Sequence, residues 1–200
     1  MYGRRTGDGR RAGPGPAAAG LFLLLTPAVA LAWSTADLLE ALAAEAPEEL
    51  VFEEIRDVEL MQTRVRGEGV LSFEPPDTFI RELKRPRSER LIIEGDSVTL
   101  EEGGEVRHTF QYGDDAGVDA IILLMRALHG RADAEAMEET FRMRLEGDRE
   151  AWRWILTPRA GGARQRIQRM TLYGAGSRVE RSVLREGGGD RVESRYRRPE

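Results

Sequence analysis

The sequence predicts a mainly β (α+β) fold, in which a meandering antiparallel sheet or barrel packs against a few α-helices. Two observations carry this prediction. Between residues 61 and 112, short segments alternate apolar and polar residues and are separated by turn residues, and a period of two is typical of half-buried antiparallel strands. Residues 34–46 and 114–131 instead place apolar residues at helical spacing.

The clearest strand covers residues 61–74. Its small or apolar alternate positions are Met61, Thr63, Val65, Gly67, Gly69, Leu71 and Phe73. Pro75 and Pro76 end it, because proline cannot donate to a strand ladder. The two glycines either leave space inside a barrel or permit a sharp bend.

Further strands are predicted on both sides of this segment. Residues 50–60 form the first, with a bulge between Phe52 and Ile55, where the alternation slips. Residues 191–196 form the last, an exposed edge strand, since Arg195 and the arginines after it suit an edge. Those between are 78–84, 90–94, 98–101, 106–112, 139–147, 151–158, 166–173 and 177–185.

Two helices have clear start and stop signals. Ser34 or Thr35 caps the first, Pro47 ends it, and its amphipathic pattern predicts that one face lies on the sheet. Residues 114–131 form the second, which Asp114 and Asp115 cap. It is apolar on more than one face, so it is either a core helix or a lid over a cavity. A short helix or a turn is expected at 133–139 and a loop at 158–164.

The N-terminus has the pattern of a secretory signal peptide. A basic segment precedes an apolar run at 17–32, which ends in small residues at Ala30 and Ala32. A membrane anchor is the alternative, but the run is shorter than the ~20 residues that a span needs, and Pro27 interrupts it. We therefore expect cleavage near Ala32, a periplasmic protein, and one domain at residues 33–200.

Charge and composition exclude several classes of function. Without residues 1–32 the chain carries 26 basic and 34 acidic residues, a net charge of −8. This balance is unfavourable for nucleic acid and for anionic lipid headgroups. The chain has no cysteine, and His108 and His129 are its two histidines, so no metal site is expected.

No pattern of catalytic residues is evident. His108 shares a strand face with Val106 and Phe110 and is interpreted as a partly buried structural histidine, with a catalytic base as the alternative. Asp114 and Asp115 begin a helix. The glycine pairs lack the Lys-Ser/Thr of a phosphate-binding loop. We expect no catalytic residue and no enzyme.

Four short segments, in this order, resemble the LolA-like group of periplasmic outer-membrane lipoprotein carriers. They are Phe52–Glu54 (FEE), Gly69–Asp77 (GVLSFEPPD), Leu91–Thr99 (LIIEGDSVT) and Trp152–Pro158 (WRWILTP). The resemblance implies a half-open antiparallel barrel closed by helices, an apolar interior for acyl chains, no cofactor and no bond chemistry. Pro75 stands where these carriers often have an arginine, which implies a divergent member.

The resulting hypothesis is a monomeric carrier that takes lipoproteins or other acylated lipids from the inner towards the outer membrane, with an inner-membrane transporter as donor and an outer-membrane acceptor. Its ligand face is predicted to comprise Phe52, Val65, Leu71, Phe73, Phe79, Leu91, Ile93, Trp152 and Trp154. A lid contributes Val118, Ile121, Met125 and Leu128. The alternatives are an envelope protein-interaction or lipid-sensing module and, less favoured, a lipid hydrolase built on His108.

Overall fold

One curved, unclosed antiparallel sheet organises the molecule. The computed structural model describes residues 33–159 and 161–200, so the predicted signal peptide lies outside the described residues. The sheet has 11 strands in the order β6-β5-β4-β3-β2-β1-β11-β10-β9-β8-β7. The predicted mainly β fold with a few covering helices is confirmed. The strands are β1 Glu49–Val58, β2 Thr63–Glu74, β3 Thr78–Arg85, β4 Glu89–Glu94, β5 Ser97–Glu102, β6 Glu105–Gln111, β7 Phe141–Gly147, β8 Trp152–Pro158, β9 Ile167–Ala175, β10 Arg178–Glu186 and β11 Arg191–Arg197.

The first and last strands meet in the middle of this sheet. β11 pairs with β1 on one side and with β10 on the other. The prediction of an exposed edge strand was therefore wrong, and the two edges are β6 and β7. Arg195 and Arg197, which prompted the prediction together with Arg198, sit at outward positions of β11, and Arg198 follows the strand.

β1 is regular, and the predicted bulge between Phe52 and Ile55 is absent from its pairing with β2. Leu50, Phe52 and Glu54 are its buried positions, so the alternation never slips and Ile55 is simply on the other face. The irregularity lies one strand away, between β2 and β3 at Glu68 and Gly69.

Gly69 is required by this irregular pairing. A Cβ atom at Gly69 would lie 2.0 Å from the Glu82 carbonyl oxygen and 2.5 Å from the Phe52 ring. At Gly67 it would lie 3.0 Å from the Arg85 carbonyl oxygen. Neighbouring atoms therefore fill the space beside both glycines, so the explanation that they leave open space inside a barrel was wrong.

Four helices accompany the sheet in the described residues: α1 Thr35–Ala44, α2 Ala116–Leu128, α3 Ala134–Thr140 and α4 Gly161–Arg166. Ser34 and Asp37 form a capping box on α1, and Asp115 caps α2. A loop was predicted where α4 lies, and this was wrong. Its sequence begins with two glycines, but tertiary contacts hold it: Ala163 is buried, and Arg164 Nε donates to the Pro158 carbonyl oxygen at 3.0 Å.

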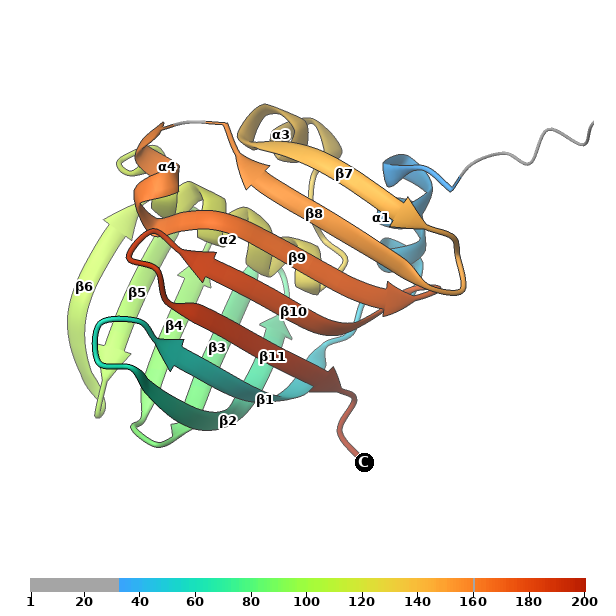
Figure 1. Ribbon diagram of the computed structural model, residues 1–200. Helices are drawn as coiled ribbons and strands as arrows, with labels where there is room; N and C mark the ends of the chain where they lie inside the picture. Colours follow the sequence, from blue (N-terminus) through green and yellow to red (C-terminus); the bar gives the residue numbers. More distant parts are fainter. Residues whose placement is uncertain (1–32, 160) are drawn as a thin grey trace, which may run out of the picture. The chain divides into compact units, whose positions relative to one another are not determined.

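α2 lies on the concave side of the sheet. Figure 1 shows it between β3–β6 behind and β8–β10 in front. Most of its residues are buried, as its apolar sequence predicted. No helix in the described part of the chain is long and apolar enough to span a membrane.

Candidate functional site

An apolar cavity of about 190 Å³ lies between α2 and the concave face of the sheet. α2 contributes Ile121, Leu124, Met125 and Leu128. The apolar side chains from the strands come from both halves of the sheet; they are Phe52, Leu71, Leu91, Met170, Leu184 and Val192, with Ile167 at the start of β9. Because strands at both ends of the chain build its wall, the cavity forms only when the whole sheet is assembled.

One side of the cavity is polar, which the sequence analysis missed. Glu54, Arg56, Arg81, Ser182, Ser194 and Tyr196 complete its lining. Glu54 is 5% exposed, and its carboxylate pairs with the Arg81 guanidinium. The signal for Glu54 was its place two residues after Phe52 in a regular strand, but the predicted bulge between Phe52 and Ile55 broke that alternation.

The same polar side contains a hydroxyl pair. Tyr196 and Ser182 lie 2.7 Å apart, oxygen to oxygen. Burial raises the pKa of Tyr196, an effect that the Ser182 and Ser194 hydroxyls partly offset. Arg81 lies over the Phe52 ring, 4.8 Å from its centroid, so its charge faces both a carboxylate and an aromatic surface. These contacts fix the polar groups at the wall of an otherwise apolar cavity.

Polar contacts hold both ends of α2. At the first turn, the Asp115 carboxylate accepts a hydrogen bond from the Arg166 guanidinium of α4 at 2.8 Å. This hydrogen bond, together with those from the Gly117 and Val118 backbone, lowers the pKa of Asp115 to about 2. Near the last turn, Arg126 contacts the Asp77 carboxylate at 3.3 Å and the Gly95 carbonyl oxygen at 3.4 Å. The middle of the helix contributes the apolar residues over the cavity.

The two histidines lie in opposite environments. His129, just after α2, is fully buried, and its Nδ1 lies 3.2 Å from the Pro47 carbonyl oxygen. Its Nε2 has no hydrogen-bond partner among the described residues. Burial lowers the pKa of His129. His108 is exposed on the edge strand β6, so the prediction that it is partly buried was wrong.

Six of the predicted site residues line the cavity: Phe52, Leu71, Leu91, Ile121, Met125 and Leu128. The other seven do not line it: Val65 is partly exposed on β2, and the buried core holds Phe73, Phe79, Ile93, Val118, Trp152 and Trp154. The Phe73 ring packs against the Phe79 ring in a tilted arrangement, with centroids 4.9 Å apart, and it lies under Arg131. Trp152 Nε1 donates to the Gly176 carbonyl oxygen at 3.0 Å. The missed apolar lining, such as Met170 and Leu184, comes from the C-terminal strands.

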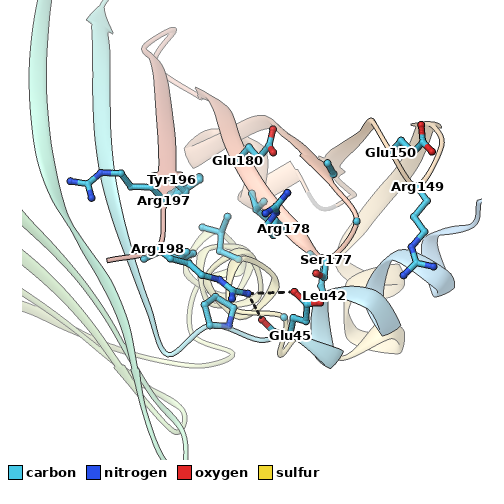
Figure 2. A pocket seen from close by; sticks show the side chains of 17 residues that line it. Leu42, Glu45, Arg149, Glu150, Ser177, Arg178, Glu180, Tyr196, Arg197 and Arg198 are labelled. Atoms are coloured by element: carbon cyan, nitrogen blue, oxygen red, sulfur yellow. Dashed lines mark hydrogen bonds and ion pairs between the residues drawn. The ribbon is translucent and has the colours of Figure 1, made fainter. Parts of the chain in front are cut away.

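A larger hollow of about 880 Å³ opens at the surface beside the cavity. Figure 2 shows it between the end of α1 and the β7–β8 and β9–β10 turns, with Arg198 reaching Glu45 at 3.5 Å. Seven of the 17 residues that line it are charged, and these include Arg149, Arg178 and Arg197. Leu128 and Tyr196 line both this groove and the cavity. The groove and the apolar cavity therefore adjoin each other at these two residues.

No group of three or more histidine or carboxylate side chains in residues 33–159 and 161–200 is placed to hold a metal ion. The buried carboxylate Glu54 is already paired with Arg81. What the arrangement offers is a largely apolar enclosure with a fixed polar wall.

Comparisons with solved structures returned distant matches. A LolA superfamily protein from Nitrosomonas europaea is 10% identical, with a TM-score of 0.39 over 82% of this chain and 91% of that chain. The lipoprotein LppX from Mycobacterium tuberculosis is 10% identical, with a TM-score of 0.37 over 82% and 95%. MucB of Pseudomonas aeruginosa, solved with MucA, is 16% identical with a TM-score of 0.34; the match covers 80% of this chain and 54% of that one.

A search of curated proteins found no match. The family model described as outer membrane lipoprotein carrier protein LolA-like matches residues 27–199. This range includes every described helix and strand. The chain belongs to the LolA-like family.

Proposed function

We propose that this protein is a periplasmic carrier that binds lipoproteins or other acylated lipids and shuttles them from the inner towards the outer membrane. The observation that carries the proposal is the apolar cavity under α2, in a member of a carrier family. In this role the protein binds and releases its cargo without bond chemistry. Residues 1–32 act as a signal peptide and are removed on export.

The size of the cavity implies that the lid moves. An apolar cavity of about 150 Å³ accommodates a benzene molecule, so about 190 Å³ accommodates a short piece of an acyl chain. A longer chain requires α2 to shift away from the sheet. During this shift the polar contacts of Asp115 and Arg126, at the two ends of α2, either break or act as hinges.

The energetics require partners. An acyl chain gains ~0.8 kcal/mol per methylene on leaving water, and a membrane offers the same gain. The cavity therefore gives no large net driving force for extraction from a bilayer. An inner-membrane transporter supplies the cargo in this proposal, and an outer-membrane acceptor receives it.

A pair of neighbouring residues on α2 tests the proposal. Ile121 is partly exposed and lines the cavity, whereas Ile122 is fully buried and does not line it. In Ile121→Ala the retention of a fluorescent fatty acid should fall roughly ten-fold, because methylene contacts with the ligand are lost. In Ile122→Ala the free energy of unfolding should fall by about 3 kcal/mol, while folded protein retains the probe.

The measurement is the dissociation rate of the probe, alongside urea unfolding, on protein exported from the full-length chain and purified. Native mass spectrometry of the same material identifies any lipid that it carries. An unliganded mass together with no probe uptake by the wild-type protein would overturn the carrier proposal in favour of a protein-interaction module.

A further inference from the structure

Arginines gather on the outward surface of β7–β11, opposite the cavity. We call this surface the arginine face and define it by Arg144, Arg153, Arg169, Arg181, Arg185 and Arg191, which surround one hollow of about 460 Å³. Among the described residues that line the hollow, Glu146 is the one acid. The whole chain has a net charge of −5. The fold therefore concentrates positive charge on one face of an acidic protein.

Strand alternation places this face away from the cavity. Met170, Ser182 and Leu184 line the cavity. Arg169, Arg181 and Arg185 are their immediate neighbours in the chain, and successive side chains of a strand point to opposite sides of the sheet. In Figure 1 these strands lie in front of α2, with this outward side turned to the viewer.

Arg144, Arg153, Arg181 and Arg191 each have a carboxylate partner, but one row of this face holds like charges side by side. Arg185 stands directly opposite Arg169 on β9 and directly opposite Arg191 on β11. Like charges directly opposite each other destabilise a sheet. Arg191 has carboxylates at 2.5 Å (Glu193) and 3.5 Å (Asp57), whereas Arg169 and Arg185 have no ion-pair partner within the described residues. An anion above this row would relieve the repulsion.

The side chains at the floor of the hollow are short and uncharged. Ile155 and Val183 both stand opposite Thr171, so three uncharged side chains lie in one row across β8, β9 and β10. Long arginine side chains rise around them. Five strands spaced about 4.8 Å apart make the face roughly 19 Å wide. A face of that width matches an extended anionic surface better than a single small ion.

The side chains of the arginine face indicate which kind of anionic surface it binds. The guanidinium fork binds phosphate oxygens in pairs. Protein–protein interfaces have an apolar core, rich in aromatic residues, but the aromatic residue here is Tyr173, and Arg181 covers its ring at 3.7 Å. We propose that the arginine face docks the protein on the phosphate headgroups of an anionic membrane. This goes beyond cargo carriage and does not depend on it.

Net charge alone predicted that this protein does not bind anionic lipid headgroups, and the arginine face changes that expectation. Charges separated by more than a Debye length, about 8 Å at physiological salt, are largely screened. Acidic residues on other surfaces therefore do little to oppose attraction at this face. What governs docking is the local charge.

Co-sedimentation with vesicles tests the proposal. Protein exported from the full-length chain is mixed with vesicles of phosphatidylglycerol and phosphatidylethanolamine (1:3), or of phosphatidylcholine alone. The wild-type protein should sediment with the anionic vesicles and be released by 0.5 M NaCl. Arg169→Gln/Arg185→Gln should weaken binding about 25-fold, since each arginine near such a surface contributes about five-fold.

The matched control is Arg87→Gln/Arg107→Gln. It changes net charge equally, but its positions lie after β3 and on β6, in the other half of the sheet. Its vesicle binding should stay within about two-fold of wild type. The face variant should unfold at the same temperature as wild type or higher, because a repulsive row is removed.

Equal binding to neutral and anionic vesicles, wild-type binding by the face variant, or an equal loss in the control would each overturn the proposal. Capture of an acidic polypeptide without vesicle binding would also overturn it and assign the face to a protein partner. None of these results involves the fatty-acid probe, so the carrier proposal stands or falls separately.

Discussion

At the scale of single residues, the most informative feature is a buried ion pair in an apolar wall. Glu54 is 5% exposed and Arg81 is 22% exposed. Such a pair gives little net stability compared with apolar residues of the same size, because both charges lose water. Breaking it, however, leaves a charge without its partner. Glu54 is the more buried of the two, so it suffers more from the loss of its partner.

This asymmetry gives a first prediction. Arg81→Met should lower the free energy of unfolding by about 3–5 kcal/mol, since it leaves the buried Glu54 carboxylate unpaired. Glu54→Leu should cost about 1–3 kcal/mol, because Arg81 retains some contact with water. The double variant should be close to wild type. Urea unfolding of all four proteins measures the coupling, and additive losses would contradict it.

His129 carries the second prediction. Burial lowers its pKa below the ordinary value of 6.5. Above that value both the folded and the unfolded state are neutral. Below it the histidine binds a proton in the unfolded state but stays neutral in the folded state, so the free energy of unfolding falls as the pH falls. The slope contributed by this group should approach about 1.4 kcal/mol per pH unit.

The two histidines provide the comparison for this prediction. Unfolding free energies are measured at pH 7.5 and pH 5. His129→Asn should remove this part of the pH dependence, whereas His108→Asn should keep it, because His108 is exposed on β6. A variant at position 129 with the same pH dependence as wild type would rule out this origin.

At the scale of the elements, α2 combines an apolar middle with polar attachments at its ends. Asp115 serves both as the N-cap of α2 and as the partner of Arg166 on α4. The pKa of Asp115 is lowered to about 2 in the folded protein. The contact therefore stabilises the fold fully above pH 3.8, the ordinary pKa, and this stabilisation is lost as the pH falls from 3.8 to about 2. At neutral pH the contact is fully formed.

Asp115→Asn separates the two roles. Asparagine caps a helix as well as aspartate does, so α2 should remain, while the ion pair with Arg166 is lost. We expect faster hydrogen exchange in α4 and faster release of a bound fatty acid, with global stability changed by less than about 1 kcal/mol. Asp133→Asn is the control, since Asp133 caps α3 through Ala136. Equal effects of both substitutions would refute the separate role.

The sequence predicted what depends on local pattern. Alternation identified Leu71 and Phe73 as inward residues, and Asp115 marked the start of α2. An alternation of apolar with polar residues predicts an apolar interior, so it did not predict Glu54 and Arg81, which pair with each other at the cavity wall. α4 was missed because its two leading glycines are poor helix formers. Contacts with distant residues, such as Arg166 with Asp115, hold this helix in place.

At the scale of the whole molecule, long-range pairing decides both shape and charge. No local signal in residues 191–196 indicated that they pair with β1, some 140 residues earlier in the chain. The same pairing places Val192, Ser194 and Tyr196 in the cavity wall. The pairing of β11 with β10 on its other side sets Arg191 beside Arg185 on the arginine face. Neither site is therefore visible in a linear pattern, although each residue's inward or outward position follows from alternation.

The central position of β11 yields the last prediction. A chain that ends at Asp190 lacks the strand that joins β1 to β10, so two interior strands become unpaired edges and the cavity loses part of its wall. It should show no cooperative thermal unfolding by circular dichroism and should bind a dye for exposed apolar surface. A chain that ends at Arg198 keeps β11 and the contact between Arg198 and Glu45, and it should unfold as wild type does. Cooperative unfolding of the shorter chain near the wild-type temperature would mean that the two halves of the sheet are stable without β11, contrary to a core that both halves enclose.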